Sequence, residues 1–338
     1  MKTNKTYIIA EVGPNHNGKI DIALEMIDKL SEIGVDAVKF QISNPENAYS
    51  LDSFKPDYQK IGDKSQSPIE MSKKYQLPFN AHKDLYKRCL EKKVDYICSA
   101  FEMDSLNFLW DNFDMPYFKI ASGEIFTVDM LDFIASKEKP IILSTGMSTY
   151  DEIRVALNYL DKNKIKDITV LHCVSSYPAM AEDVNLNAML ELKRLFGYKV
   201  GLSDHSLGNE ASIAAVALGA TLIEKHVTLD KSWEGPDHQA SSSIEEFADL
   251  VKSIRKVDLL MGIKDKVFTE KELEIKKAAR KSIVTTHNLK KGDVIMREDI
   301  CFKRPGIGIS PIFVNELIGR VIKNDIDENR VVKEEDLI

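Results

Sequence analysis

Two histidines and a glutamate occupy similar places in the sequence, each at the end of a short apolar run. His205 lies in GLSDHS, His226 in IEKHVT and Glu11 in YIIAEVG. Two imidazoles and a carboxylate suit Mn²⁺, Zn²⁺, Co²⁺ or Fe²⁺ better than Mg²⁺ alone. Two hydrogen-bonded histidines are the alternative, but their shared placement favours a divalent-metal site held by His205 and His226.

Two lysines, Lys39 in AVKFQ and Lys119 in YFKIAS, interrupt apolar runs, where an unpaired charge is costly to bury. Three interpretations stay open: an ion pair with Glu11 or Glu124, a clamp for an anionic substrate, or an amine that forms a Schiff base. Nearby hydroxyls suit a phosphate or carboxylate better than a dehydrating imine pocket, although each alone would be read as a strand-end cap. They belong to Ser99, Ser122, Ser144 and Ser203.

The segment EVGPNHNG (11–18) lacks the spacing of a phosphate-binding loop or of a dinucleotide fingerprint. Its Gly-Pro pair shapes a turn, and Asn17 with Gly18 is expected to start the following helix, with Asn17 as the candidate cap. These structural roles leave Glu11 and His16 unexplained.

The elements that must position these side chains are short β-branched runs alternating with amphipathic segments. Eight runs are expected to be strands: 7–13, 37–41, 95–100, 117–122, 140–145, 168–174, 199–204 and 222–228. Eight segments are expected to be helices: 19–34, 82–93, 103–113, 128–137, 150–164, 186–197, 209–219 and 243–262. Eight strand–helix units over about 250 residues predict an α/β fold of the (β/α)₈ TIM-barrel type. A doubly wound sheet is the alternative, disfavoured by the missing dinucleotide fingerprint.

Polar residues that core packing does not require fall at or just after the carboxyl end of each expected strand. Barrel enzymes build their active sites at this face. One polar strand end would mean little, whereas polar ends on all eight predict a site. The residues are Glu11, Lys39, Gln41, Ser99, Lys119, Ser122, Glu124, Ser144, His172, Ser175, Tyr177, Ser203, Asp204, His205, Glu224 and His226.

The alternation also predicts the domain organisation. Residues 1–265 are expected to form the catalytic barrel, with a 42–81 connection whose length suggests a functional or mobile loop. Residues 266–280 are expected to be a charged linker that includes a helix. Residues 281–338 contain short apolar runs broken by turn sequences and predict a small, mostly β domain, which is marginal alone and therefore expected to dock on something.

Composition excludes several classes of function. The 338 residues are 43% hydrophobic and carry a net charge of −7, which argues against general nucleic-acid binding. The four cysteines show no paired spacing, as is typical of a reducing compartment. The first apolar run is too short for a signal peptide, and none approaches a membrane span, so we expect a cytoplasmic protein that does not bind membranes.

Taken together, the motifs resemble the sialic acid synthase family, which makes N-acetylneuraminate, legionaminate and pseudaminate. The resemblance rests on AEVGPNHNG, DAVKFQ, FKIASGE, PIILSTGM, LHCVSSYP, GLSDHS, EKHVT and GPDH, followed by KRPGIG in a C-terminal antifreeze-like module. It covers nearly the whole chain in the family's order. It implies a barrel followed by an antifreeze-like SAF domain of β-clip type, in a domain-swapped homodimer whose modules cover each other's barrel mouths.

The resemblance also implies a reaction, in which phosphoenolpyruvate condenses with an N-acetylated amino-sugar aldehyde to give a nine-carbon 2-keto acid and phosphate. His205 and His226 would hold the divalent metal, Mn²⁺ first and Mg²⁺ or Co²⁺ as alternatives, and Glu11 would act near the reacting carbons. The residues implied to bind phosphoenolpyruvate are Lys39, Ser99, Lys119, Ser122, Ser144, Ser175 and Ser203. Those implied to face the sugar are Gln41, Glu124, Tyr177, Asp237 and, from the partner subunit, Arg304.

One departure leaves the acceptor sugar open. Family members that form N-acetylneuraminate read Asn-Ile-Tyr-Pro after the sixth strand, whereas this chain reads Ser175-Ser176-Tyr177-Pro178. N-acetylmannosamine and a 2,4-diacetamido-trideoxyhexose are therefore both candidates. Two other functions compete: a keto-acid sugar aldolase that uses Lys119 as a Schiff-base amine, and a non-enzymatic glycan- or ice-binding protein that acts through the C-terminal module.

Overall fold

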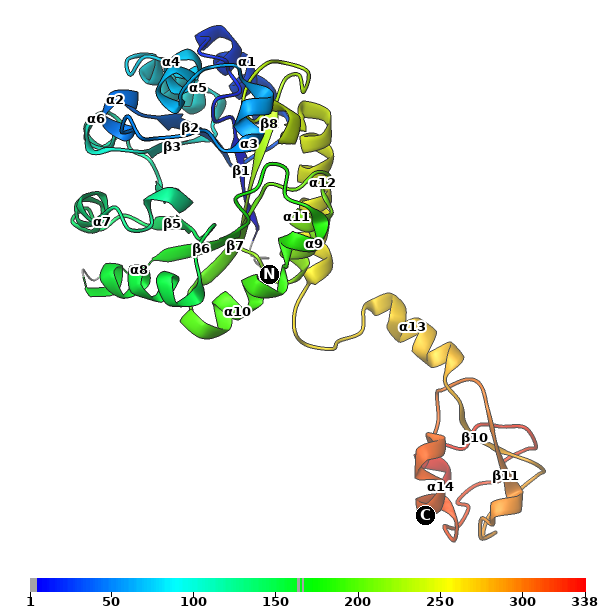
Figure 1. The fold of residues 1–338 in the computed structure, drawn as a ribbon. Helices are drawn as coiled ribbons and strands as arrows, with labels where there is room; N and C mark the ends of the chain where they lie inside the picture. The colour runs from blue at the N-terminus through cyan, green and yellow to red at the C-terminus, as the bar shows by residue number, and fades with distance from the viewer. Residues whose placement is uncertain (1–4, 163–164, 166) are drawn as a thin grey trace. The chain divides into compact units, whose positions relative to one another are not determined.

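Eight parallel strands follow one another around a closed barrel (Figure 1). They are β1 (Tyr7–Glu11), β2 (Ala37–Ile42), β3 (Asp95–Ala100), β4 (Phe118–Ile120), β5 (Ile141–Ser144), β6 (Ile168–Cys173), β7 (Lys199–Asp204) and β8 (Leu222–Thr228). The barrel closes because β1 pairs with both β2 and β8, which places Ile9 opposite Ala37 on one side and Glu224 on the other. The computed structural model describes residues 5–162, 165 and 167–338, and all eight expected strands are present.

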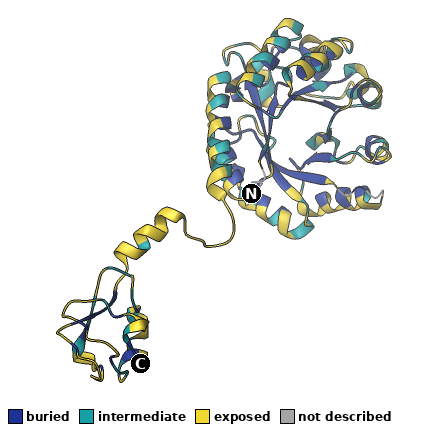
Figure 2. Cartoon of the chain, turned by 180° about the vertical axis from the view of Figure 1, so that it is seen from behind, coloured by how far each residue is buried: buried dark blue, intermediate teal, exposed yellow. Residues whose placement is uncertain are grey.

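Helices surround the barrel, and each strand-to-strand connection contains at least one. They are α1 (Ile20–Glu32), α5 (Ala81–Lys92), α6 (Met103–Asn112), α7 (Val128–Ala135), α8 (Tyr150–Lys162), α9 (Ala181–Val184), α10 (Asn187–Phe196), α11 (Glu210–Ala217) and α12 (Ile244–Met261). In α1 the buried residues Ala23, Met26, Ile27 and Leu30 form one stripe at helical spacing. Figure 2 shows the same division around the barrel, with buried strands and helices exposed on their outer sides. The end of the helix predicted over 150–164 lies outside the described residues.

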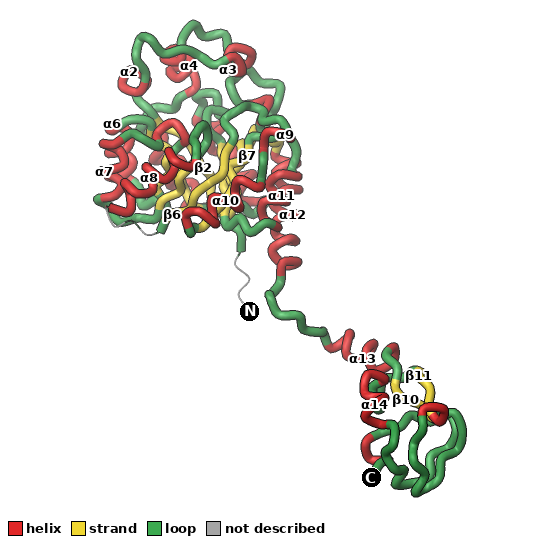
Figure 3. The backbone as a smooth tube through the Cα atoms, turned by 60° about the horizontal axis from the view of Figure 1, so that its bottom comes forward, coloured by secondary structure: helices red, strands yellow, loops and turns green. Residues whose placement is uncertain are grey.

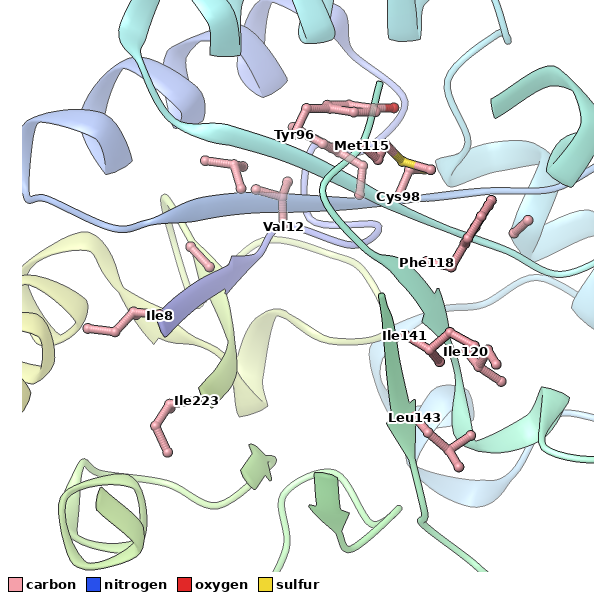
Figure 4. Packing of buried hydrophobic residues seen from close by; sticks show 14 of the residues in the cluster. Ile8, Val12, Tyr96, Cys98, Met115, Phe118, Ile120, Ile141, Leu143 and Ile223 are labelled. Carbon is pink, nitrogen blue, oxygen red and sulfur yellow. The ribbon is translucent and has the colours of Figure 1, made fainter. Parts of the chain in front are cut away.

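Outward-facing strand residues form the main hydrophobic core beneath these helices. Ile8 of β1, Phe118 of β4 and Leu143 of β5 belong to this cluster and are almost fully buried (Figure 4). Successive side chains of a strand point to opposite faces, so the neighbours of these residues point into the barrel.

An apolar layer fills the inside of the barrel. Six residues from six different strands pack together there: Ile9, Ala37, Ile97, Ile142, Leu171 and Leu222. Two positions further along each of these strands, where the side chain again points inward, stands a polar or thiol residue: Glu11, Lys39, Ser99, Ser144, Cys173 and Glu224. The alternation of the strands therefore places a polar layer directly above an apolar one.

The 42–81 segment, which we expected to be a functional or mobile loop, is partly helical. It contains three short helices, α2 (Pro45–Ala48), α3 (Asp57–Gly62) and α4 (Pro68–Tyr75), which lie together at one end of the barrel (Figure 3). The Oδ1 of Asn44 and the Oγ of Ser67 each accept a backbone N–H of the helix that follows, with proline at the first helical position. Asn-Pro and Ser-Pro are ordinary helix-start signals, which the expectation of a functional or mobile loop did not take into account.

Contacts along the chain divide it into two units, Met1–Gly262 and Ile263–Ile338. The second unit contains α13 (Glu270–Ala279) and α14 (Val314–Leu317), with an antiparallel pair formed by β10 (Ser282–Thr285) and β11 (Ile300–Lys303). It has a hydrophobic cluster of its own, built around residues such as Ile283, Ile295 and Ile322. The smaller elements of the described residues are β9 (Ser242–Ser243) and the 3₁₀ turns Ser122–Glu124, His238–Ala240, Arg297–Asp299, Pro311–Phe313 and Glu334–Asp336.

Across the part of the chain that the structure describes, no helix is long and apolar enough to cross a membrane.

Asp204 is buried at the end of β7, where it stabilises the fold and does not line the inside of the barrel. Its carboxylate accepts hydrogen bonds from Lys225 Nζ at 2.9 Å, Ser212 Oγ at 2.6 Å and Ser206 Oγ at 2.6 Å. Burial opposes its ionisation, but Lys225 and the hydroxyl donors outweigh it and lower the pKa of the carboxyl. The aspartate therefore stabilises the folded state in its charged form.

We expect Asp204→Asn to lower the free energy of unfolding by about 3–5 kcal/mol at pH 7, because it leaves the Lys225 ammonium buried without its counter-charge. A carboxyl with a lowered folded pKa contributes its full stability above the unfolded pKa of about 3.9 and loses it as pH falls through the folded pKa. Urea unfolding at pH 7 and pH 3 measures both effects. A difference between variant and wild type that stayed constant with pH would contradict the ion pair.

Candidate active site

A cavity of about 410 Å³ opens at the carboxyl ends of the strands, and all eight strands contribute to its lining. Thirteen of the residues expected from the sequence to form the site line this one cavity. They are Glu11, Lys39, Gln41, Ser99, Lys119, Ser122, Ser144, Ser175, Tyr177, Ser203, His205, His226 and Asp237.

The floor of the cavity is a buried network of two lysines and two glutamates. Lys39 Nζ lies 2.8 Å from Glu11 Oε2 and 3.7 Å from Glu224 Oε2. Lys119 Nζ lies 3.1 Å from Glu224 Oε1. All four side chains are at most 5% exposed, and their formal charges cancel. The lysines thus do have acidic partners, Glu11 and Glu224 rather than Glu124, and they also face a cavity.

Hydroxyl groups bind directly to this network. Lys119 Nζ donates to Ser144 Oγ at 2.8 Å, and Lys39 Nζ donates to Ser99 Oγ at 3.3 Å. Ser203 Oγ donates to Glu224 Oε1 at 3.0 Å. Each hydroxyl can reorient, so these groups could move their hydrogen bonds from the network to an anion in the cavity.

Ser122 and Ser175 approach the site through a glycine. The Gly146 N–H donates to Ser122 Oγ at 2.9 Å, and a Cβ at Gly146 would overlap Ser175 Oγ. Gly146 therefore allows two hydroxyls to converge beside the network, where a larger residue would separate them.

The ionisable groups of the floor differ in how their pKa values are shifted. Burial and the neighbouring Glu224 carboxylate raise the pKa of Glu11, despite the opposing effect of Lys39. Burial lowers the pKa of Lys119, whereas the carboxylates of Glu11 and Glu224 outweigh burial at Lys39 and raise its pKa. Glu11 is therefore the carboxyl of this layer best suited to hold a proton.

Above the floor, His205 and His226 face each other with ring centroids 5.5 Å apart. His205 Nδ1 lies 2.7 Å from the Val174 carbonyl oxygen, to which it donates, and its Nε2 lies 3.0 Å from Tyr177 OH. Burial opposes protonation of this ring, but Cys173 and the Val174 carbonyl outweigh it and raise the pKa of His205. The buried Nδ1 of His226 has no hydrogen-bond partner among the described residues and lies 3.6 Å from Asp237 Oδ2. Burial and the nearby His205 keep the pKa of His226 far below its ordinary value.

The orphaned nitrogen of His226 and the Nε2 of His205, which contacts only hydroxyl groups among the described residues, could serve together as ligands of a divalent metal ion. A neutral imidazole is a common ligand for such metals. The described residues contain no ready-made group of three or more histidine, cysteine, aspartate or glutamate ligands. An ion held by this pair would therefore keep positions open for other ligands.

Two residues expected to face the sugar, Glu124 and Arg304, are not in the cavity lining formed by the described residues, and neither are the polar strand ends His172 and Asp204. Glu124 Oε2 accepts a hydrogen bond from Thr127 Oγ1 at 2.6 Å, within its own turn. Arg304 belongs to the second unit.

The sequence reasoning gave no role to several residues that do line the cavity. Glu224 was recognised only as a polar strand end, although it joins both lysines. The 42–81 segment supplies a whole wall, whose residues are Ser43, Tyr49, Pro56, Tyr58, Gln59, Met71, Ser72, Tyr75 and Gln76. These positions do not lie in a strand pattern, so the only indication in the sequence that they could be functional was the unusual length of the segment.

The turn at 11–18 is built differently from our expectation for Asn17. The helix α1 begins at Ile20 with Lys19 as its N-cap residue, and Asn17 adopts a positive φ of 51° with its Oδ1 bound to His238 Nε2 at 3.0 Å. Its role as a cap is therefore wrong, and it ties this turn to the loop after β8. His16 lines the cavity, and its Nδ1 accepts the Gly18 N–H at 3.1 Å.

A closed barrel that gathers buried cations, carboxylates and paired imidazoles at the carboxyl ends of its strands has the arrangement of a barrel enzyme. The sequence profile of the NeuB family matches residues 26–266, and that of the SAF domain matches residues 280–338. The chain belongs to the NeuB family.

Relatives extend over nearly the full chain. N,N'-diacetyllegionaminic acid synthase from Campylobacter jejuni is 40% identical over 333 residues, covering 98% of this chain and 99% of the relative. Pseudaminic acid synthase from the same species is 35% identical over 335 residues, covering 98% and 96%. The solved structure of N-acetylneuraminic acid synthetase from Leptospira borgpetersenii, in complex with citrate, is 32% identical with a TM-score of 0.72, covering 81% of this chain and 90% of that one. These matches confirm the resemblance and the fold class predicted from the sequence.

Proposed function

We propose that this protein is a nonulosonic acid synthase that condenses phosphoenolpyruvate with a 2,4-diacetamido-trideoxyhexose, giving a nine-carbon 2-keto acid and phosphate. The observation that carries the proposal is the polar layer of the barrel, where two buried lysines and several hydroxyls lie beside a pair of imidazoles in a chain of the NeuB family. The choice of acceptor is supported by the 40% identity to a synthase of a diacetylated product. The aldolase and the non-enzymatic alternatives find no support among the relatives.

Phosphoenolpyruvate binds over the floor of the cavity. Lys39 and Lys119 turn from their glutamate partners toward the phosphate and carboxylate, and the serines beside them move their hydrogen bonds to the same oxygens. Charged donors bind an anion more strongly in a water-poor cavity than in water, because both the hydrogen bonds and the Coulomb attraction are stronger there. Serine donors for these oxygens are Ser99, Ser122, Ser144, Ser175 and Ser203.

The acceptor lies above, with its aldehyde toward His205 and His226. His205 and His226 would hold a divalent metal there, with Mn²⁺ as the first candidate, and the metal would supply Lewis-acid polarisation of the aldehyde oxygen. Gln41, Tyr177 and Asp237 orient the sugar, and the cavity holds the enol carbon and the aldehyde carbon in reacting geometry.

Carbon–carbon bond formation leaves positive charge at C2 of the former phosphoenolpyruvate, and the buried carboxylates of Glu11 and Glu224 stabilise it. Water then adds at C2, and the tetrahedral intermediate expels phosphate to leave the keto group. Gln41 Nε2 donates to Glu11 Oε1 at 2.6 Å and orients that carboxyl, whose raised pKa suits it to take a proton from the water.

The second unit supports a proposal on assembly, and the cysteines support a proposal on location. A homodimer in which each SAF domain covers its partner's barrel mouth is supported by exposed apolar residues on that unit, such as Ile312 and Phe313, and would bring Arg304 to the acceptor. A cytoplasmic location is supported by the four unpaired cysteines.

The test of the function is a phosphate-release screen with phosphoenolpyruvate against a panel of amino sugars. We expect release with a 2,4-diacetamido-trideoxyhexose, at least tenfold slower release with N-acetylmannosamine, and none with phosphoenolpyruvate alone. N-acetylmannosamine 6-phosphate serves as the charged control, because none of the cavity-lining residues in the described part of 42–81 is lysine or arginine. If none of the amino sugars in the panel gave phosphate release, the proposed synthase activity would be refuted. A preference for the phosphorylated sugar would refute the proposed acceptor.

A further inference from the structure

The wall formed by residues 42–81 differs in chemistry from the rest of the cavity. The floor is charged, whereas this wall is lined by the neutral aromatic and amide side chains of Tyr49, Tyr58, Gln59, Tyr75 and Gln76. The Gln76 amide bonds to Ser43 and Ser72, and the Tyr75 hydroxyl to Asp63, so the amide available to a ligand is that of Gln59. Aromatic faces pack well on C–H surfaces, and amide side chains match acetamido groups as both donors and acceptors. The wall therefore suits a neutral amino sugar rather than an anion.

Tyr58 extends an aromatic stack that begins at the paired imidazoles. The Tyr177 ring stacks on His205 with centroids 4.1 Å apart and an interplanar angle of 29°. The Tyr58 ring stacks on Tyr177 at 5.1 Å and 23°. The 42–81 segment thus adds an outer aromatic face to a sugar-facing residue of the barrel itself.

Asp63 fixes the segment that carries Tyr58. This aspartate is 1% exposed, and its Oδ2 accepts from Lys55 Nζ at 2.6 Å and from the Ser65 N–H at 3.0 Å. Its Oδ1 accepts from Tyr75 OH at 3.0 Å, which joins the segment to α4. Lys55 Nζ also donates to the backbone carbonyl oxygens of Asp63 and Ser65. Residues 55 and 63–65 are thereby tied together, and α3 with Tyr58 forms a short closed loop between them.

A glycine contact sets the position of this loop against the barrel. The Gly235 N–H donates to the Gly62 carbonyl oxygen at 2.9 Å. A Cβ at Gly62 would lie far inside van der Waals distance of the Gly235 carbonyl oxygen. The loop therefore packs directly on the segment that leads to Asp237, another residue of the cavity.

From these contacts we propose that Tyr58 is a specificity-determining residue that packs against the acceptor sugar, and that Asp63 is the positioning residue that holds Tyr58 there. The inference rests on the proposed function, because it names the part of the same cavity that recognises the acceptor. It assigns to the 42–81 segment a role separate from phosphoenolpyruvate binding. Substrate contact by Tyr58 is expected to appear in the acceptor KM and not in the phosphoenolpyruvate KM.

Steady-state kinetics of two Tyr58 variants test the contact. We expect Tyr58→Ala to raise the acceptor KM at least tenfold, with the phosphoenolpyruvate KM unchanged and kcat within threefold of wild type. Tyr58→Phe keeps the ring and should stay within threefold of wild type in every constant. Equal changes in both KM values, or no change in the alanine variant, would overturn the role of Tyr58.

Two further variants test the positioning by Asp63. Asp63→Asn should reproduce the rise in acceptor KM, and Gly62→Ala should do so without removing any cavity side chain, which keeps the test valid if the aspartate variant fails to fold. Lys60→Ala is the matched control and should leave every constant unchanged, since among the described residues Lys60 pairs only with the exposed Asp57 on the same helix. A lower kcat with unchanged KM values in both Asp63→Asn and Gly62→Ala would show a loss of folded enzyme and refute positioning. Wild-type protein that released no phosphate with any acceptor would instead refute the proposed function.

Discussion

Replacing Lys119 with methionine is expected to lower kcat/KM for phosphoenolpyruvate about 100- to 1,000-fold. Loss of one charged partner from a buried, hydrogen-bonded anion contact costs roughly 3–4 kcal/mol, and each 1.4 kcal/mol is a factor of ten. Methionine fills nearly the same volume as the lysine chain, so the change removes the charge with little loss of packing. Phosphate release measured at varied phosphoenolpyruvate and saturating acceptor gives the ratio.

A second variant separates binding from stability. In Lys119→Met, Glu224 keeps the hydrogen bond from Ser203, but Lys39 at 3.7 Å is the one cation left beside it among the described residues, so the free energy of unfolding is also expected to fall by about 3 kcal/mol. Adding Glu224→Gln removes the excess negative charge and should restore much of that stability but none of the activity. If the double variant recovered activity together with stability, the role of Lys119 as an anion-binding group would be wrong.

Replacing His226 with glutamine is expected to abolish phosphate release to less than 0.1% of wild type, on the order of the contribution of a Lewis acid worth several kcal/mol. The His226 ring is buried, and its Nδ1 lacks a partner among the described residues, so glutamine can occupy the site without breaking a hydrogen bond there. Metal content after dialysis against Mn²⁺, measured by elemental analysis, should fall from one equivalent to nearly none. This readout does not depend on activity.

His172 provides the matched control for His226. It is also buried in a barrel strand, but its Nε2 lies 2.6 Å from the Val184 carbonyl oxygen and it does not line the cavity. His172→Gln should therefore keep the bound metal and most of the activity. EDTA should inactivate the wild-type protein, and Mn²⁺ should restore it. Full activity in EDTA, or full metal content in His226→Gln, would contradict the metal site.

The sequence predicted the barrel and the floor of the site because both follow from one local rule. Side chains alternate along a strand, so Ile9 and Glu11 point to the same inward face. An apolar residue two positions before a polar one therefore indicates the apolar layer of the barrel interior followed by the polar layer of the site. The expectation that the lysines in apolar strands have a chemical role came from the cost of burying an unpaired charge and from the hydroxyls near them. The sequence named Glu11, which is the partner of Lys39, but not Glu224, because the pairing of Lys119 with Glu224 spans 105 positions and depends on closure of the barrel.

The rest of the site could not be predicted because it depends on tertiary contacts. Tyr58 reaches the cavity only because Asp63 and Lys55 fold the segment back on itself, and neither residue stands out in the sequence. The misassigned Asn17 has the same cause, since its side chain bonds to His238, 221 positions away. Local cap and turn preferences do not include such partners.

The two-residue spacing between the apolar layer and the polar layer also limits which mutations this protein can tolerate in its strands. A single-residue insertion or deletion within a strand would turn the apolar-layer residue and the reactive residue of that strand outward together, so folding and catalysis would fail at once. The 42–81 segment is free of this coupling, because its cavity residues stand on short helices outside the barrel sheet. New acceptors can therefore be acquired by mutation in this segment, while the chemistry stays fixed by the register of the strands.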